Sequence, residues 1–365
     1  MTWTPSDHDI AGWRLRTQAL VAPYAASADA VVRSLLAVQA ENPAQSAWAV
    51  ACRTSAPDAT DLADLLADGR IVRTHVLRPT WHYVAAEDVG WLLELTAPRV
   101  RRTTGSQLRT NGFDDTAQEV LASAVHGTLV DSPDLTRDEL GAALAAAGHQ
   151  LSGQVLMLLL ADLELQRLVV SGRPRDGVHT YAAFEDRVPA PRRIDRDEAL
   201  AELARRYITG HGPATTADLA YWATLTIGDA RRGLEAAQHE LLSFEHDGRT
   251  YWHAADQEPP APGPTDPAAH LLQILDEVYR GFQDSRMVLD SDGVVPPGRE
   301  TSTGMALVNG QMVATMKRTL APQRVRFALM AYERRSLSAA DRTALEEAAM
   351  RYGSFLGVQA ELVVG

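Results

Sequence analysis

The sequence predicts an α+β fold that is mainly helical, with three tandem units of one design followed by a different C-terminal domain. Three observations support this: a repeated order of helices and hairpin, a proline-rich break, and a change of pattern beyond the break. At 365 residues the chain is too long for a single core. Its 45% hydrophobic and 22% charged residues are typical of a globular protein, and no apolar run is long enough to predict a membrane span.

The repeat is clearest in the middle of the chain, where Leu135–Leu144 resembles Ala214–Ala223. Both segments have a Thr-x-x-acid pattern, which is typical of a helix N-terminus. The expected neighbours are a preceding helix (near 115–124 and 197–207), a following helix (151–168 and 225–242) and a hairpin (169–181 and 244–252). Asp247-Gly248 predicts a two-residue turn in the second hairpin. Helix, helix, helix, hairpin is the order of a winged helix-turn-helix unit.

The N-terminal segment repeats this order more loosely. We expect helices near 28–40, 44–53 and 60–68, a C-cap at Gly69, and strands at 71–78 and 81–84 that turn at Pro79-Thr80. The expected boundaries are 1–104, 105–190 and 191–258 for the three units, then a linker at Pro259–Pro264, then a domain at 265–365.

The C-terminal domain is expected to be α+β. The pattern predicts a helix at Ala268–Phe282, a hairpin that turns at Asn309-Gly310, a strand at 324–332, a helix opened by Ser338 and a final strand at 358–364.

Gln39 and Glu41 form the most informative polar pair. They follow the apolar helical face of Ala28–Val38, and Pro43 disfavours helical geometry at Asn42, so we expect the helix to end there. Side chains two residues apart share a face only in an extended segment. An amide and a carboxylate that converge there can orient a water and stabilise a developing cation. The alternative is a helix end with two solvated polar side chains.

Several kinds of site are not expected. Cys52 is the only cysteine and lies in an apolar run, so it is expected in the core. The histidines lack metal-ligand spacing, and no glycine-rich phosphate loop is present. We therefore expect neither a metal nor a cofactor. The polar, acidic start is unlike a signal peptide, so we expect a cytoplasmic protein, associated with the nucleoid when it is bound to DNA.

A net charge of −12 argues against a broadly basic nucleic-acid binder, although a local basic groove remains compatible with it. The candidate DNA contacts are Arg73, Arg78, His82, Arg101, Arg102, Lys317 and Arg318. His82 is either a polar group that lines such a groove beside Gln39 and Glu41 or a satisfied interior imidazole.

Segments along the whole chain resemble the AlkZ/YcaQ-type winged-helix DNA glycosylases. They include 35–41, 48–53, 73–84, 212–215, 229–234, 275–286 and 308–315. In that family the catalytic motif is Gln–apolar–Gln or Gln–apolar–Asp, and the resemblance maps it onto Gln39-Ala40-Glu41. The sequence departs from the family by Glu at the last motif position, and by Met316-Lys317 where relatives tend to have an aromatic residue and Arg.

The resemblance implies three winged helices around a C-shaped groove and the excision of alkylated bases, N7- or N3-purines that include bulky or crosslinked ones, from double-stranded DNA. Bulky adducts would then be excised without full base flipping. Glu41 would act as base and cation stabiliser, and Gln39 would orient the water or sugar. We expect a monomer. The alternative from another class is a non-catalytic winged-helix DNA-binding protein, a regulator or damage sensor, which would not need the Gln39/Glu41 pair.

The lysine count makes a testable prediction. A glycosylase that also cleaves the strand forms a Schiff base, which needs an amine. This chain offers only Lys317, its single lysine, and the α-amino group of Met1. We predict a monofunctional enzyme, so that borohydride traps no covalent protein–DNA adduct during turnover. A strong trapped band that disappears in Lys317→Arg would contradict this.

Overall fold

The computed structural model describes residues 4–188, 190–259, 267–273, 275–296 and 304–365. The expected α+β class is confirmed. Most of the predicted linker, residues 260–264, lies outside the described residues. Within the described part of the chain, no helix has both the length and the apolar character needed to cross a membrane.

The first part of the chain forms five helices around a three-stranded sheet. Their bounds are α1 (Asp7–Thr17), α2 (Ala28–Leu35), β1 (Ala37–Gln39), α3 (Pro43–Ala51), α4 (Ala59–Asp68), β2 (Ile71–Val76), β3 (Arg78–Ala85) and α5 (Ala86–Thr110). Ser27, Asn42 and Asp58 cap α2, α3 and α4 through their side chains. The predicted C-cap at Gly69 is confirmed by its left-handed conformation.

Two predictions in this part are wrong. The helix expected over 28–40 ends at Leu35, because Leu36 adopts a φ of 63° and the following residues pair with β3 as strand β1. The hairpin turns at Leu77, which has a φ of 64°, whereas the predicted turn at Pro79-Thr80 lies inside β3. Helix α1 was not anticipated, although Ser6 and Asp9 form a capping box at its start.

The second and third parts share the order of elements of the first. The second contains α6 (Asp115–Asp131), β4 (Leu135–Thr136), α7 (Arg137–Ala146), α8 (Gly153–Leu165), β5 (Val169–Ser171), β6 (Thr180–Ala183) and α9 (Phe184–Arg187). The third contains α10 (Arg196–His211), β7 (Ala214–Thr215), α11 (Thr216–Trp222), α12 (Ile227–Ala236), β8 (Leu241–His246) and β9 (Arg249–Ala254). The predicted capping boxes at Thr136 and Thr215 and the Asp247-Gly248 turn are confirmed.

The three small sheets have the same topology. Their strand orders are β1-β3-β2, β4-β6-β5 and β7-β9-β8, so in each a short first strand pairs with the last strand of the hairpin. All these pairings are antiparallel. The sequence repeat is therefore a repeat of structure: helix, short strand, two helices, hairpin.

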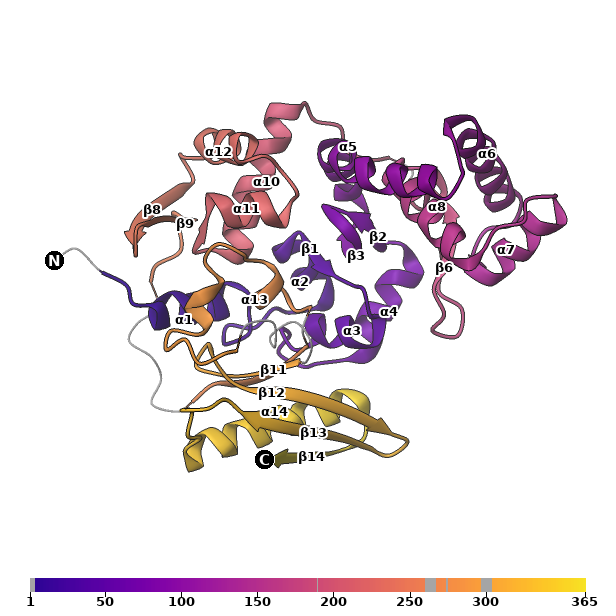
Figure 1. The fold of residues 1–365 in the computed structure, drawn as a ribbon. Coiled ribbons are helices and arrows are strands. Elements are labelled where there is room, and N and C mark those ends of the chain that lie inside the picture. Colours follow the sequence, from indigo (N-terminus) through magenta and orange to yellow (C-terminus); the bar gives the residue numbers. More distant parts are fainter. Residues whose placement is uncertain (1–3, 189, 260–266, 274, 297–303) are drawn as a thin grey trace.

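The C-terminal part is a five-stranded sheet that packs against one long helix (Figure 1). It comprises β10 (Ala269–Leu272), α13 (Glu277–Arg280), the 3-10 helix η1 (Arg286–Leu289), β11 (Gly304–Val308), β12 (Gln311–Ala321), β13 (Arg324–Ala331), α14 (Ala339–Leu356) and β14 (Gln359–Val364). The turn at Asn309-Gly310 and the Ser338 cap are confirmed. The helix expected at Ala268–Phe282 is wrong, because its apolar start pairs with β11 as a strand and, among the described residues of this range, only Glu277–Arg280 are helical.

Residues that precede and follow α13 join the C-terminal part to the rest of the molecule. Asp276 accepts two hydrogen bonds from Arg53, at 2.6 and 3.0 Å, and both side chains are fully buried. Arg14 of α1 donates to the backbone and side chain of Ser285 and to the carbonyl of Pro213. These buried charges are paired as burial requires, and they tie the first and third parts to one segment of the last.

Candidate active site

The polar pair lies at a strand-to-helix junction. Gln39 ends β1 opposite His82, and Asn42 caps α3 three residues later. In the other two repeats, the last residue of the short strand is itself the helix cap, Thr136 or Thr215. In the first repeat, Ala40 and Glu41 lie between the strand and the cap, so the cap comes three residues after the last strand residue. Gln39 therefore lies in a strand and not at the end of the helix predicted over 28–40.

Gln39 is held from both its backbone and its side chain. It is 5% exposed, its backbone N–H donates to Glu277 Oε1 at 2.8 Å, and its side-chain oxygen accepts from Arg78 at 3.1 Å. The bond from Arg78 fixes the orientation of the amide. No hydrogen bond from the described residues engages the amide nitrogen, which is left as a donor.

Arg78 and His82 support this amide from the interior. The same Arg78 nitrogen lies 3.2 Å from His82 Nε2, while His82 Nδ1 lies 2.9 Å from the carbonyl oxygen of Thr80. Since a carbonyl only accepts, Nδ1 carries the proton and Nε2 accepts from Arg78. Burial and the neighbouring Arg78 charge lower the pKa of His82 to about 3. His82 is fully buried and neutral at physiological pH, which matches the interior-imidazole alternative.

Glu277 is the buried carboxylate on which this arrangement converges. Besides the Gln39 N–H it accepts from the Trp222 indole at 3.0 Å and lies 3.4 Å from His211 Nε2, both in the third repeat. Burial alone would raise its pKa, but the His211 contact and the charge of Arg78 lower the pKa to about 2. One ionised group therefore links α13, strand β1 and the third repeat.

Glu41 is different from Gln39 because it is exposed. Its carboxylate accepts from the backbone N–H of Trp81 at 3.1 Å, and its carbonyl oxygen lies 3.4 Å from an Arg73 nitrogen. Arg73 also donates to the Ala40 carbonyl at 2.9 Å. The backbone of the motif is thus clamped while the carboxylate faces solvent, where it can accept a proton from water.

The other candidate residues fall into two groups. Arg73, Arg78 and His82 are buried and hydrogen-bonded internally, and of the three only Arg73 also lines the cleft beside the motif among the described pockets. Arg101 is partly exposed and makes two 3.1 Å bonds to the buried Asp162, whereas Arg102 is exposed. In strand β12, Lys317 is exposed and Arg318 donates to the Tyr352 hydroxyl.

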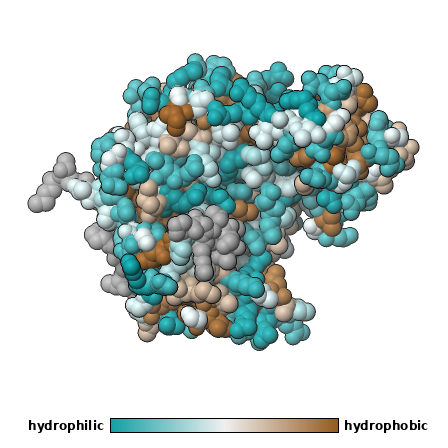
Figure 2. Space-filling model, in the orientation of Figure 1, coloured by the Kyte–Doolittle hydropathy of each residue, from teal (hydrophilic) through white to brown (hydrophobic). Residues whose placement is uncertain are grey.

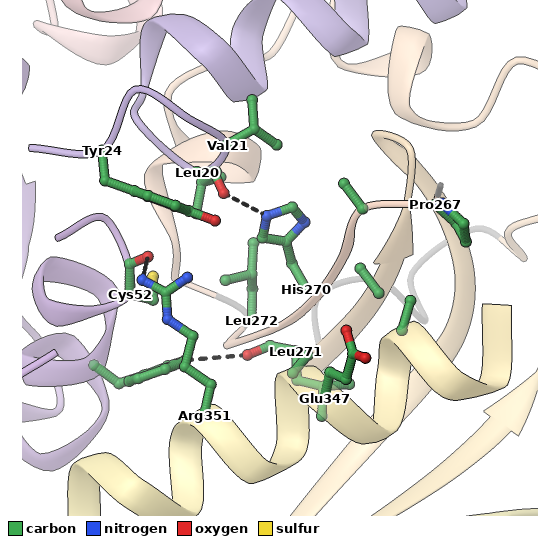
Figure 3. Close-up of a pocket in the computed structure, with 15 residues that line it drawn as sticks. Leu20, Val21, Tyr24, Cys52, Pro267, His270, Leu271, Leu272, Glu347 and Arg351 are labelled. Carbon is green, nitrogen blue, oxygen red and sulfur yellow. Dashed lines mark hydrogen bonds between the residues drawn. The ribbon is translucent and has the colours of Figure 1, made fainter. Parts of the chain in front are cut away.

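No cluster of three or more metal-ligating side chains occurs among the described residues. A cavity of about 220 Å³ lies between the N-terminal part and the C-terminal sheet and helix. Figure 3 shows Tyr24, His270 and Arg351 on its walls, with His270 bonded to the Leu20 carbonyl. Neither Gln39 nor Glu41 lines this cavity, so it belongs to the packing between these two parts.

Sequence reasoning did not single out Glu277, His211 or Trp222 as parts of the site. Glu277 lies in the segment 275–286 that resembles the glycosylase family. However, nothing in the local sequence around Asp276 and Glu277 indicates that Glu277 is buried. Its partners lie 238, 66 and 55 residues away in the chain. Only the fold brings these groups together.

Comparison with known proteins identifies close similarities. Residues 32–355 match the sequence model of a family described as "DNA glycosylase AlkZ-like". The "Interstrand DNA cross-link repair glycosylase" of Streptomyces sahachiroi is 28% identical over 228 residues, which span 59% of this chain and 60% of that relative's length. The solved structure "Streptomyces sahachiroi DNA glycosylase AlkZ" aligns over 100% of both chains with a TM-score of 0.78 at 22% identity, which shows a shared fold.

The pKa of Glu277 predicts an acid-sensitive fold. Because the folded-state pKa is about 2, below the ordinary 4.5, the stabilisation is complete above about pH 4.5 and is lost as pH falls toward 2. Glu277→Gln should lower the free energy of unfolding at pH 7 by about 3 kcal/mol, as for a broken buried pair, and this deficit should shrink in acid. Urea unfolding between pH 3 and 7 measures it, with the exposed Glu119→Gln as control. A deficit that is independent of pH would contradict the assignment.

Proposed function

Because the chain belongs to the AlkZ-like DNA glycosylase family, we propose that it is a monofunctional DNA glycosylase that hydrolyses the N-glycosidic bond of alkylated purines in DNA. The single observation that carries this proposal is the motif junction. An exposed carboxylate, Glu41, follows a buried and oriented amide, Gln39, in a segment whose backbone is clamped on both sides. A protein that only binds DNA has no need of this arrangement.

The proposed reaction does not need a general acid. A purine alkylated at N7 or N3 is cationic, so the bond between C1′ and N9 breaks with its electron pair moving to the base, which leaves neutral. The sugar becomes oxocarbenium-like and is stabilised by the Glu41 carboxylate. Glu41 accepts a proton from water as the water oxygen bonds to C1′, which yields an abasic site with a free hydroxyl group.

Gln39 contributes geometry. With its oxygen held by Arg78, its NH₂ group is available to donate to the attacking water or to a sugar oxygen. Arg78, His82 and Glu277 then act as positioning residues, since they hold Gln39 and lie behind it. We therefore no longer expect Arg78 and His82 to contact DNA directly. Arg73 holds the backbone of the motif through the carbonyl groups of Ala40 and Glu41.

The relative's name refers to interstrand cross-links. We propose that the substrates of this chain are N7- or N3-alkylated purines in double-stranded DNA, with bulky or crosslinked adducts among them. The exposure of Glu41 supports this, because a carboxylate that is open to solvent does not require the base to enter a deep pocket. The protein would act as a monomer.

We further propose that the three repeats are winged helix-turn-helix units arranged as a C-shaped groove for the duplex. The repeated helix order and the three equivalent sheets support this proposal. The surface in Figure 2 is indented between the second repeat and the C-terminal part, which is compatible with such a groove. Arg102 and Lys317, which are exposed, are the candidates for phosphate contacts, with Arg101 and Arg318 beside them.

Replacing Glu41 tests the catalytic assignment. Glu41→Ala and Glu41→Gln should slow single-turnover base release by about a hundredfold or more, because each removes a charge that stabilises the cationic transition state. Folding should be retained, since the side chain is exposed. The measurement is release of N7-methylguanine from an oligonucleotide duplex, followed by alkaline cleavage of the abasic sites.

Glu119→Ala is the matched control, because Glu119 is an exposed carboxylate on α6. Wild-type rates in Glu41→Ala would exclude Glu41 as the base. Tight binding of damaged duplex by the wild-type protein with no base release would favour the non-catalytic alternative.

Salt dependence tests the phosphate contacts. Each phosphate contact releases counterions. Arg102→Gln should therefore make the negative slope of log affinity against log salt shallower by about one. Arg101 is left intact, because its removal would leave Asp162 buried without its ion pair. Fluorescence anisotropy with duplex DNA gives the slope. An unchanged slope would place the groove elsewhere.

A further inference from the structure

A second opening lies beside the motif, between the first and second repeats. It is a cleft of about 340 Å³. Part of its lining combines rings, an apolar side chain and a guanidinium group: Pro43, Arg73, Trp81, Val178, His179 and Tyr181. The first three come from the motif side, and the last three from the β5–β6 hairpin of the second repeat. The rest of the lining, at the start of α7, is polar or charged. The cleft is therefore formed jointly by the first and second repeats.

The cleft is directly adjacent to Glu41. Trp81, one of its walls, donates its backbone N–H to the Glu41 carboxylate at 3.1 Å. Arg73, another wall, donates to the carbonyl of Ala40 and lies 3.4 Å from that of Glu41. A base whose C1′ lies at Glu41 would therefore have the mouth of the cleft beside it.

The inner surface of the cleft places a guanidinium group over an aromatic ring. The Arg73 guanidinium carbon lies 4.4 Å from the centroid of the Trp81 ring. The Trp81 indole N–H points to the buried Glu164 at 3.5 Å, and the Trp81 ring packs 4.4 Å from that of His75. A guanidinium group stacked on an indole presents a planar surface on which another aromatic ring can stack.

His179 adds an unsatisfied polar atom. Its Nε2 is buried and has no hydrogen-bond partner among the described residues. Its ring lies 6.2 Å from Trp81 and 4.6 Å from Tyr181. Burial and the nearby Arg73 charge lower the pKa of His179 to about 4, so the ring is neutral at physiological pH. Leaving a buried polar atom without a partner is unfavourable, and a ligand in the cleft that offers a hydrogen bond removes this penalty.

We propose that this cleft is a specificity subsite for a flat aromatic substituent carried by the alkylated base. This inference rests on the proposed function and names the adduct class for the same site. The substituent stacks on the Arg73–Trp81 surface, and a polar atom on it pairs with His179. A methyl group is too small to reach either feature, so the subsite acts on bulky adducts.

Filling the cleft from its exposed edge tests the proposal. Val178 and Val130 are each 52% exposed, so Val178→Trp obstructs the cleft and Val130→Trp on α6 is the matched control. The measurement is single-turnover release from duplexes that carry one N7-benzylguanine or one N7-methylguanine. Val178→Trp should lower the benzyl-to-methyl rate ratio about tenfold, while Val130→Trp leaves the ratio unchanged.

An unchanged ratio in Val178→Trp, or equal slowing of both substrates, would overturn the subsite. If the wild-type protein releases neither base, the proposed function is wrong, and the subsite is then tested by binding alone. Fluorescence anisotropy should then show that the wild-type protein prefers the benzyl duplex to the methyl duplex and that Val178→Trp loses this preference. No preference in the wild-type protein would overturn the subsite independently of catalysis.

Discussion

The buried carboxylate of Glu277 is the constraint on which the site depends. An ionised group in the interior is tolerated only if it is paired and hydrogen-bonded, and Glu277 meets this condition with groups from two other regions. The Gln39 N–H belongs to β1, and His211 and Trp222 belong to the third repeat. Because a partly satisfied carboxylate would be costly, these regions are held in one relative position. The position of strand β1 is thereby determined by a residue of the C-terminal part.

This constraint explains the contrast between the two motif residues. Gln39 lies next to the buried network and is fixed at its backbone and side chain, whereas Glu41, two residues later, is beyond it and exposed. Ala40 and Glu41, which lie between strand β1 and the Asn42 cap, take the chain from the buried interior at Ala40 to the exposed surface at Glu41. A rigid amide and an accessible carboxylate suit a reaction in which water must be positioned and a cation stabilised.

Much of the fold could be predicted because its signals are local. Capping residues such as Thr136 and Ser338, and the turns at Asp247-Gly248 and Asn309-Gly310, depend on a few neighbouring residues. The Gln39/Glu41 pair could be chosen from spacing and resemblance, and its roles remain proposals. The early end of α2, the turn at Leu77 and strand β10 could not be predicted, since they depend on pairing with distant strands. Leu36 and Leu77 even adopt positive φ, which their side chains disfavour and tertiary contacts impose. Glu277 was missed for the same reason.

Amide hydrogen exchange at Gln39 tests the central claim most directly. In the wild-type protein its N–H donates to a buried, ionised Glu277, so it should exchange slowly at neutral pH, like the interior of the β1–β3 ladder. In Glu277→Ala, which removes the acceptor, exchange at Gln39 should increase by at least about tenfold, while amides in the β8–β9 hairpin of the third repeat stay unchanged. Rapid exchange at Gln39 in the wild-type protein, or equal protection in both proteins, would show that Glu277 does not hold strand β1.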